Sequence, residues 1–347
     1  MAESVQGPDG RKPGTRMRGF VVARLRRLEY LVVLLAVLFV VGAGLLSLFG
    51  GDALRRLASI PAGTLVAMLA LSLVNYGCRG IRWLFYTRRL GLAVAPGRNL
   101  LFYVAGFALT TTPGKFGEAL RLWLIERCYG YRYERLAPLF LADRLSDMNG
   151  VLLICLVGAL GFPAKAWLAL AAGAAVLLLT AAFVFPRPLI RVMAALYDLG
   201  GRRGRRLFAR VRTALRHTAR LFRAPVYGAS LVLSLGGWFA ESLAFALLLA
   251  ALGTGLSLLP AMFVFTVAMI VGAISMLPGG LGSTEATMIG LLLALKVEFD
   301  SALVATAVIR LTTLWFGVGL GSLALPFALR LARRPPALSM AALAVRP

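Results

Sequence analysis

Long apolar stretches alternate with short polar ones along most of the chain. Predominantly apolar segments lie at about 30–49, 64–86, 137–161, 165–186, 227–252 and 301–327. Each is close to the roughly 20 residues that an α-helix needs to cross a bilayer. Polar stretches precede and divide them: residues 1–29 are polar and basic, and residues 187–224 are rich in arginine. The pattern predicts an all-α polytopic membrane protein.

Two further apolar regions are each interrupted by a similar Pro-Gly motif. The stretch TTPGKFGEALR (111–121) separates apolar segments at 100–112 and 117–128, and LPGGLGSTEA (277–286) separates segments at 260–277 and 284–296. Proline removes a backbone donor and glycine permits a sharp turn, so each region should contain a broken helix. We expect each to be a re-entrant, Pro-Gly-broken helix pair.

The two halves of the chain match in order and at a nearly constant offset. Pro113-Gly114 recurs as Pro278-Gly279, Glu118 recurs as Glu285, and Arg144 recurs as Arg310. Pro96 and Pro260 continue the series, as do the LSL triplets at 71–73 and 233–235. These ordered matches predict an internal repeat, and the count of spans makes its two copies inverted in the membrane.

The expected organisation follows from this repeat. It comprises a cytoplasmic basic tail (1–29), a first transmembrane repeat (30–161), a second transmembrane repeat (162–327) that contains the basic cytoplasmic loop 187–224, and a cytoplasmic tail (328–347). With both termini inside and both broken segments re-entrant, most of the 38 Lys and Arg lie on the cytoplasmic side and few lie outside. This distribution satisfies the positive-inside rule.

Composition narrows the class of partner. The chain is 60% apolar, and its net charge of +24 lies between the spans, where anionic lipid headgroups are the expected partner. We therefore expect no nucleic-acid binding. The arginine-rich, Ala- and Leu-rich composition is typical of a GC-rich bacterial genome and indicates a bacterial cytoplasmic membrane. The single histidine and three scattered cysteines supply no metal site, and no nucleotide-binding loop is present.

Polar residues at the two breaks and inside the spans are the candidates for substrate binding. Helices that resume after Gly117 and Gly282 direct their positive ends at the break, which suits an anionic group such as a phosphate. An ionisable side chain inside a span is costly and is a functional candidate by default. The predicted substrate-binding residues are Pro113, Gly114, Lys115, Gly117, Glu118, Arg121, Arg144, Asp147, Glu241, Pro278, Gly279, Gly280, Gly282, Glu285 and Arg310.

Several of these residues admit two interpretations. Arg144 and Arg310 either contact an anionic headgroup or form ion pairs with the acids of the re-entrant turns. Glu118 and Glu285 either cap their helices or take part in gating, proton coupling or cation binding. Asp147 and the neighbouring Asp143 are placed to pair with Arg144, with Asp143 near the interface.

Ionisable residues also lie in the second span and in its counterpart in the other half. Its arginines, Arg79 and Arg82, are expected to extend to the headgroups at the cytoplasmic end. Glu241 occupies the place of Arg79 in the other half.

The motifs resemble those of a known family. TTPGKFGEALRLWLIER (around 110–127), LADRLSDMNGVLLI (141–154), LPGGLGSTEA (277–286), VIRLTTLWFGVGLGSL (308–323) and RGIRWLFYTRRLG (79–91) are similar to the flippase-like transmembrane domain of lysylphosphatidylglycerol synthases. The resemblance covers about 25–330. It implies a domain that moves lipids between leaflets. We expect a stand-alone member without the synthase domain, and so no aminoacylation.

The function expected is therefore that of a lipid transporter or flippase, not an enzyme and without a cofactor. Its substrate would be a phosphate-bearing lipid, such as an aminoacyl-phospholipid or a polyprenyl phosphate. One alternative is a non-transporting membrane scaffold that recruits a lipid-modifying synthase or a glycosyltransferase. The other is a membrane-embedded transferase, for which Asp143 and Asp147 alone supply too few acids. The lipid, the direction of transport and the oligomeric state stay open.

Overall fold

A computed structural model of the chain describes residues 51–112, 116–162 and 224–333, with five isolated positions at 171, 173, 174, 178 and 221. The chain divides at Leu54 into two compact units, and only Gly51–Leu54 of the first is described. Across the described ranges every regular element is a helix and none is a strand. The elements are α2 (Gly51–Ser59), α3 (Ala62–Arg89), α4 (Pro96–Ala105), η1 (Gly106–Leu109), α5 (Phe116–Tyr129), α6 (Tyr133–Ala159), α10 (Ala224–Ala251), α11 (Leu258–Ile274), η4 (Pro278–Gly280), α12 (Ser283–Ala294), α13 (Phe299–Arg310), η5 (Leu311–Trp315) and α14 (Phe316–Ala332).

Three helical stretches are long and apolar enough to cross a membrane. They are Ala62–Arg89, Pro225–Ala251 and Phe299–Ala332, with 28, 27 and 34 residues. A helix rises about 1.5 Å per residue, so each exceeds the roughly 30 Å of a bilayer's hydrocarbon core. The predicted class, a helical multi-pass membrane protein, is confirmed at this level. The expected spans at 30–49 and 165–186 lie outside the described residues, apart from the isolated positions.

Local sequence explains the limits of α3. Pro61 stands directly before the helix in an extended conformation, where its missing N–H costs nothing. Arg88 and Arg89 occupy the last turn, where positive charge complements the helix dipole. Gly91 follows with a φ of 66°, which only glycine adopts readily, and the chain reverses there.

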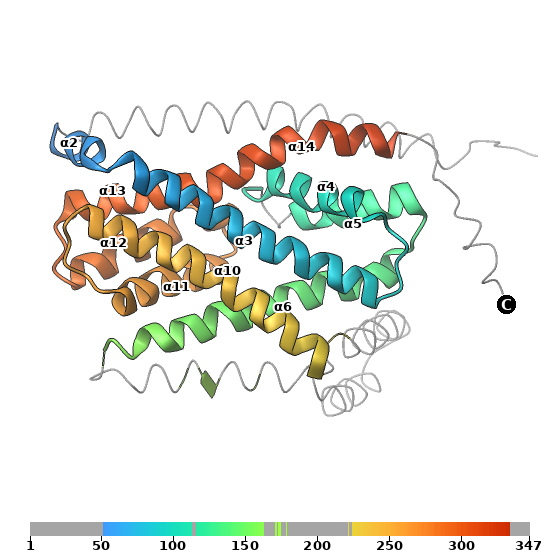
Figure 1. Cartoon of the computed structure of the whole chain (residues 1–347), viewed down its shortest axis with the longest axis horizontal. Helices are drawn as coiled ribbons and strands as arrows, with labels where there is room; N and C mark the ends of the chain where they lie inside the picture. Colours follow the sequence, from blue (N-terminus) through green and yellow to red (C-terminus); the bar gives the residue numbers. More distant parts are fainter. Residues whose placement is uncertain are drawn as a thin grey trace, which may run out of the picture. The chain divides into compact units, whose positions relative to one another are not determined.

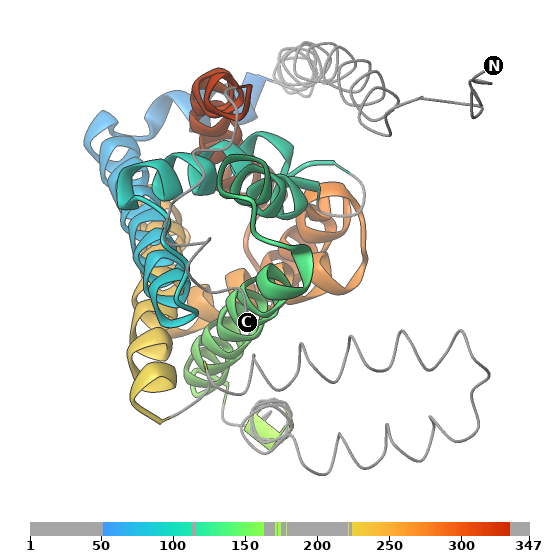
Figure 2. The ribbon, with the colours of Figure 1, turned by 90° about the vertical axis from the view of Figure 1, so that its right-hand side faces the viewer.

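Helices α3 and α10 are matched in length and in their place within each half. Each has 28 residues. The LSL triplets at 71–73 and 233–235 stand at the same place in both, nine positions after the first residue of each helix. The two helices lie side by side along their lengths, as Figures 1 and 2 both show.

The two interrupted regions are broken helices of similar build. In the first, α4 tightens into the 3₁₀ turn η1, and α5 resumes at Phe116. In the second, α11 is followed by the 3₁₀ turn η4, and α12 resumes at Ser283. The turn of the second region depends on glycine, since Gly279, Gly280 and Gly282 have φ values of 62°, 67° and 85°.

The last predicted span is not a continuous α-helix. Helix α13 ends at Arg310, a π-helical turn covers Leu311–Trp315, and α14 continues from Phe316. A π-turn widens the helix by one residue and is most common at functional sites. It stands directly after the predicted site residue Arg310.

Within the unit that begins at Arg55, the two broken regions lie at opposite ends of α3. Helices α4 and α5 lie by its C-terminal end, and α11 and α12 by its N-terminal end (Figure 1). Each broken region also packs on a helix of the other half: α14 on α4 and η1, and α6 on α11. Glycines allow both approaches, because a Cβ on Gly321 would lie 2.7 Å from the Phe107 carbonyl carbon and one on Gly158 2.6 Å from the Phe263 nitrogen.

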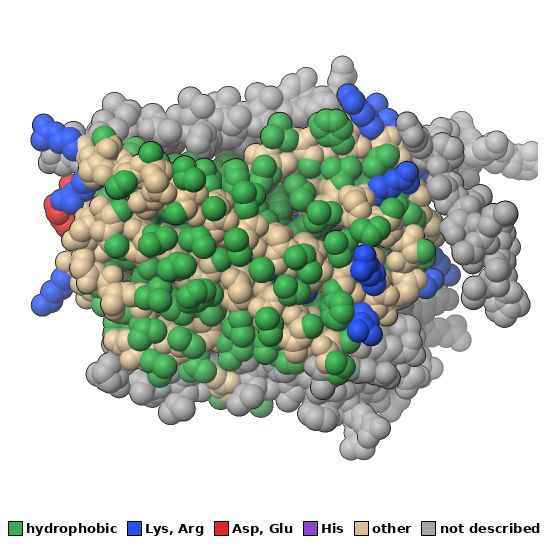
Figure 3. All heavy atoms as spheres, viewed as in Figure 1, with side chains coloured by type: hydrophobic (Ala, Val, Ile, Leu, Met, Phe, Trp, Pro, Cys, Tyr) green, Lys and Arg blue, Asp and Glu red, His purple; other side chains and the backbone are tan. Residues whose placement is uncertain are grey.

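The described surface is that of a lipid-facing protein. Figure 3 shows hydrophobic side chains over the middle of one face, with Lys and Arg toward its two ends. Large apolar side chains such as Val66, Val232, Ile274 and Leu323 are 66–71% exposed. A soluble protein rarely leaves so much contiguous apolar surface in water, whereas lipid tails accept it.

Candidate functional site

Charged side chains are buried inside the helical assembly. Among the described residues, those with 0–8% exposure are Arg82, Glu118, Arg121, Asp143, Asp147, Glu241 and Arg310. An isolated buried charge costs several kcal/mol, so each needs a partner or a ligand. Their partners therefore indicate which of them are structural and which remain available.

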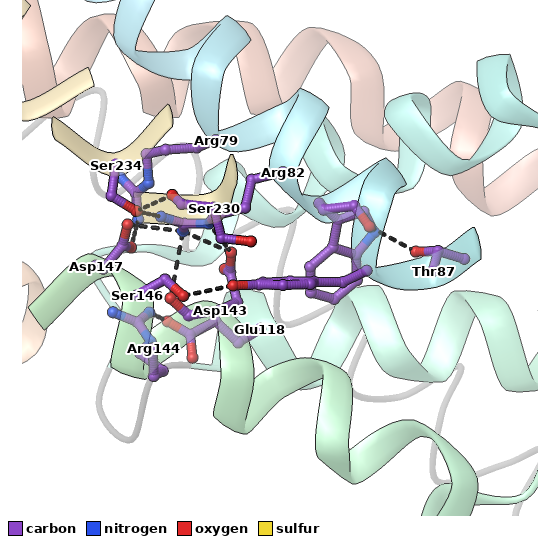
Figure 4. A network of polar contacts seen from close by, with 12 residues as sticks. Arg79, Arg82, Thr87, Glu118, Asp143, Arg144, Ser146, Asp147, Ser230 and Ser234 are labelled. Carbon is purple, nitrogen blue, oxygen red and sulfur yellow. Dashed lines mark hydrogen bonds and ion pairs between the residues drawn. The ribbon is translucent and has the colours of Figure 1, made fainter. Parts of the chain in front are cut away.

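The largest ion-pair cluster joins α3 to α6. Arg82 Nη2 donates to Asp143 Oδ1 at 2.6 Å and to Asp147 Oδ1 at 2.7 Å, while Arg79 Nη2 donates to Asp147 Oδ2 at 2.5 Å (Figure 4). Arg82 Nη1 also donates to Ser234 Oγ of α10 at 2.5 Å. The cluster ties three helices together around a fully buried guanidinium.

This arrangement corrects the expectations for the second span. Arg82 does not extend to the headgroups, because its side chain is 0% exposed and paired with both aspartates. Asp143 is buried and paired with Arg82. Asp147 pairs with Arg79 and Arg82, and Arg144 pairs with an acid of another helix. Arg79 and Arg82 are three residues apart, and Asp143 and Asp147 are four apart, so each pair lies on one face of its helix. This spacing is the feature of the sequence from which the pairing of the two helices could have been predicted.

Arg144 contacts Glu118, the acid in the first turn of α5 (Figure 4). The Arg144 side chain is 33% exposed and that of Glu118 10%. Glu118 Oε2 and Arg144 Nε are both buried and have no hydrogen-bond partner among the described residues. Each member of the pair therefore keeps one group without a hydrogen bond to a described residue: an acceptor on Glu118 and a donor on Arg144.

Arg310 forms the corresponding pair in the second half. Its Nε donates to Glu285 Oε1 at 2.6 Å, and its Nη2 donates to the carbonyl oxygen of Gly279 at 2.7 Å. Glu285 Oε2 accepts the N–H of Gly282 at 2.7 Å and so caps α12. Glu285 thus acts both as a helix cap and as an ion-pair partner, and Arg310 fixes the preceding turn.

Equivalent positions of the two halves make equivalent contacts. The Arg144–Glu118 and Arg310–Glu285 pairs each join the helix that follows a broken region to the first turn of the resumed helix. A second equivalence involves glycine. A Cβ on Gly106 would lie 2.7 Å from the Gly117 oxygen, and one on Gly272 would collide with the side chain of Thr284. In the register of the repeat, Gly272 corresponds to Gly106 and Thr284 to Gly117.

The turns of the two broken regions touch. A Cβ on Gly279 would lie 3.2 Å from Cγ2 and 3.4 Å from Cα of Thr111. Thr111 directly precedes Thr112 and the break of the first region, and its hydroxyl is buried without a hydrogen-bond partner among the described residues. Non-helical backbone from both halves therefore meets at one place.

Glu241 is a buried acid in α10, with 5% exposure. No hydrogen bond or ion pair links its carboxylate to another described residue.

The structure brings some of the predicted site residues together and leaves others apart. Pro113, Gly114 and Lys115 lie outside the described residues. Glu118 and Arg144 are brought together, as are Arg310, Glu285, Gly279 and Gly282. Arg121 lies apart from both pairs, against Tyr103. Tyr103, Thr111 and Asn75 were missed by sequence reasoning, since uncharged polar residues in an apolar helix give no pattern.

The described side chains were also compared with what a metal site requires. Within the described ranges, no group of three or more His, Cys, Asp or Glu side chains is placed to hold a metal ion. What the arrangement offers is buried ion pairs, backbone turns and unpartnered donors.

Comparison with known proteins identifies the family. The family described as "Lysylphosphatidylglycerol synthase TM region" matches residues 29–321. A UPF0104 membrane protein of Methanothermobacter thermautotrophicus is 26% identical over 321 residues, which cover 85% of this chain and 92% of that protein. Another match to a UPF0104 membrane protein of this organism is 34% identical over 96 residues, 28% of this chain and 29% of the relative. The predicted resemblance is thereby confirmed, and the chain belongs to the lysylphosphatidylglycerol synthase transmembrane-region family.

Proposed function

We propose that the protein moves a phosphate-bearing lipid between the two leaflets of a membrane. The headgroup would enter a polar region between the two Pro-Gly turns, while the acyl or prenyl tail stays in lipid. Two inverted repeats, 30–161 and 162–327, would rock against each other to expose this region to one side and then the other.

The observation that carries the proposal is the paired set of contacts around the two turns. Arg144–Glu118 and Arg310–Glu285 occupy corresponding positions of the repeat, and the turns themselves meet at Thr111 and Gly279. Broken helices that meet inside the membrane are how many transporters with inverted repeats build their substrate sites. Non-helical backbone at that depth has to be buried in protein or line a watery cavity.

The charges at these turns are suited to a headgroup. An arginine beside each turn supplies a planar set of donors that matches phosphate geometry. The glutamates compete for the same arginines, so a headgroup could displace them in turn. On this proposal, the residues that line the path of the headgroup are the polar members of the predicted set: Lys115, Glu118, Arg121, Arg144, Asp147, Glu241, Glu285 and Arg310. The four cations among them donate to the phosphate, and the acids are their counter-ions.

The proposed setting is a bacterial cytoplasmic membrane with both termini on the cytoplasmic side. The first broken region would then open toward the cytoplasm and the second toward the outside. The opposite ends at which α4–α5 and α11–α12 lie support openings toward opposite sides of the membrane. No catalytic role is proposed. Anionic lipids are the proposed partners, and nucleic acids are not.

The test is lipid exchange in reconstituted vesicles. The purified protein would be placed in liposomes that carry trace NBD-labelled phosphatidylglycerol, lysyl-phosphatidylglycerol or a short polyprenyl phosphate. Dithionite, which does not cross the bilayer, then reports how much label changes leaflet. Glu118→Gln, Arg144→Ala and Arg310→Ala are compared with wild type. The control is Arg56→Ala, which removes an ion pair with the exposed Glu298.

We expect exchange of one lipid class, lost in the three variants and retained in the control. No exchange of any phosphate-bearing lipid by well-folded protein would contradict transport. That outcome would favour a scaffold for a synthase or glycosyltransferase, which should tolerate neutral replacement of the same residues.

A further inference from the structure

Arg121 is held by aromatic rings in an unusual environment for a buried cation. Its side chain is 4% exposed on α5, and its guanidinium carbon lies 4.0 Å from the centre of the Tyr103 ring and 5.1 Å from that of Phe107. Its Nε donates to the carbonyl oxygen of Tyr103 at 3.0 Å. The rings cover the face of the guanidinium, which leaves its in-plane N–H groups as the available edge.

Arg121 differs from the other arginines inside the helical assembly in having no carboxylate contact among the described residues. Each of Arg79, Arg82, Arg144 and Arg310 is ion-paired with an aspartate or glutamate. Arg121 donates one hydrogen bond, from Nε, to the described residues, although a guanidinium carries five N–H donors. The N–H groups on Nη1 and Nη2 are free of any such bond. A buried positive charge whose Nη donors bind no described residue is satisfied most directly by an anion.

One further unpartnered donor lies beside Arg121. The Tyr103 hydroxyl belongs to the ring whose centre is 4.0 Å from the Arg121 guanidinium carbon, and it is buried without a hydrogen-bond partner in the described part of the chain. Both side chains can donate hydrogen bonds, so the chemistry they share is that of an anion-binding site.

The backbone beside Arg121 is shaped to admit this side chain. A Cβ on Gly106 would lie 2.7 Å from Arg121 Cγ and would also collide with Nε. Glycine at 106 therefore lets the arginine pass over η1 toward Tyr103. This dependence argues that the position of the guanidinium is built into the fold.

We infer that Arg121 and Tyr103 form a binding site for a phosphate group. This inference rests on the proposed function for the source of the phosphate, which is the headgroup of the transported lipid. Arg121 would bind two phosphate oxygens through Nη1 and Nη2, and the Tyr103 hydroxyl would donate to a third. The aromatic rings fix the guanidinium in advance, so little side-chain entropy is lost on binding.

The second half has no equivalent of this site. When Glu118 is aligned with Glu285, Arg121 falls on Met288. When Gly106 is aligned with Gly272, Tyr103 falls on Met269. Two methionines supply no charge and no strong donor. The site of Arg121 and Tyr103 therefore belongs to the α4–α5 side, and binding to it should favour the state that opens to that side.

The experiment is lipid binding by the whole protein in detergent, measured by native mass spectrometry. The probes are short-chain phosphatidylglycerol, the matching diacylglycerol without phosphate, and inorganic phosphate as a competitor. Variants are Arg121→Met, Arg121→Lys and Tyr103→Phe. The matched control is Arg135→Met, because Arg135 also donates to one backbone carbonyl, that of Gly91, and stacks on one tyrosine ring, but is exposed.

We expect Arg121→Met to weaken phosphatidylglycerol binding at least tenfold, and Tyr103→Phe about threefold, with Arg135→Met within twofold of wild type. Arg121→Lys should fall between, because lysine keeps the charge and loses the planar pair of donors. Diacylglycerol should bind equally to all variants. Tyr103→Phe removes a hydroxyl that no described residue uses, so it keeps the fold even where Arg121→Met does not.

Two results would overturn the site. One is wild-type phosphatidylglycerol binding by both Arg121→Lys and Tyr103→Phe. Another is equal binding of diacylglycerol and phosphatidylglycerol by wild type. Full competition by millimolar inorganic phosphate would keep the phosphate site and contradict the lipid headgroup as its source. Binding without leaflet exchange would leave the site standing and contradict transport, whereas exchange that survives Arg121→Met would contradict the site alone.

Discussion

Arg310 and Glu285 are joined by a 2.6 Å hydrogen bond between Nε and Oε1, so the end of α13 is fixed to the first turn of α12. The same arginine holds the carbonyl of Gly279, and the same glutamate holds the N–H of Gly282. One ion pair therefore organises both sides of the second break. The Arg144–Glu118 pair has none of these extra hydrogen bonds among the described residues, and the two halves differ in how firmly their turns are held.

Replacing Glu285 should therefore cost more stability than replacing Glu118. Glu285→Gln keeps an acceptor for Gly282 and removes the charge opposite Arg310, which is 6% exposed in its side chain. We expect a loss of about 2 kcal/mol, below the range for fully buried pairs because the Glu285 side chain is 27% exposed. Glu118→Gln should cost about half as much. Unfolding in SDS titrations of mixed micelles measures both.

A double-mutant cycle with Arg310→Ala separates the pair from the cap. The coupling between Glu285→Gln and Arg310→Ala should be about 1–2 kcal/mol, since the two side chains are in direct contact. Additive effects of the two changes would show that the contact between Nε and Oε1 contributes nothing and that Glu285 acts as a cap alone.

Loss of Arg82 should be the most destabilising single change in the α3–α6 cluster. Arg82→Met leaves Asp143 buried without a cation, whereas Asp147 keeps Arg79. We expect a loss of about 3–5 kcal/mol, or no folded protein. Adding Asp143→Leu removes the uncompensated charge and should restore most of the stability. Arg56→Met, which breaks the exposed pair with Glu298, should change it by less than about 1 kcal/mol.

Thermal unfolding followed by size-exclusion chromatography measures this series. If the stability losses of Arg82→Met and Asp143→Leu simply added in the double variant, the unpaired buried charge would not be the reason for the loss in Arg82→Met. Packing of the arginine stem would then be the better explanation.

The sequence was sufficient to predict the helices whose signals are local. The expected spans 64–86 and 227–252 agree closely at both ends with α3 (Ala62–Arg89) and α10 (Ala224–Ala251). Length and apolar composition decide such spans, and Pro61 and Gly91 set the limits of α3. The breaks were located for the same reason, because Pro and Gly act on the backbone where they stand.

The partners of the charged residues were less accessible from the sequence. Arg82 and Asp143 are 61 residues apart, and nothing in the periodicity of either helix states which acid meets which arginine. The repeat did predict that Arg144 and Arg310 contact the acids of the turns, and the structure contains both ion pairs. The aromatic setting of Arg121 could not be foreseen, since Tyr103 and Phe107 belong to another helix and its 3₁₀ extension.

Glycine at the crossing of each broken region should be required for packing. Gly106→Ala would place a Cβ 2.7 Å from the Gly117 oxygen, and Gly272→Ala would collide with Thr284. Each should cost about 1–3 kcal/mol, the usual cost of overpacking. Gly97→Ala is the matched control, since it lies in α4 and nothing is within 4 Å of the added methyl. It should be neutral or stabilising by up to about 1 kcal/mol.

The measurement is the melting temperature of each variant by the same chromatographic assay. A melting temperature for Gly106→Ala equal to that of Gly97→Ala would contradict the close approach of η1 and α5. An effect in one half and not in the other would limit the structural equivalence of the two regions.

Arg132 and Glu298 provide a test of the inverted repeat. They correspond in the register that aligns Arg144 with Arg310, both are exposed, and each stands directly before the helix that follows a broken region, α6 or α13. If the repeats are inverted, these positions lie on opposite sides of the membrane.

Arg132→Cys and Glu298→Cys would be made in a chain whose Cys78, Cys128 and Cys155 are replaced by alanine. A membrane-impermeant maleimide added to intact cells should label position 298, and should label position 132 only after the membrane is permeabilised. Labelling of both positions from the same side would mean that the repeats are parallel or that the broken regions cross the membrane. Labelling of position 132 alone would preserve the inversion and reverse the orientation, which would place the anion site of Arg121 on the outer side.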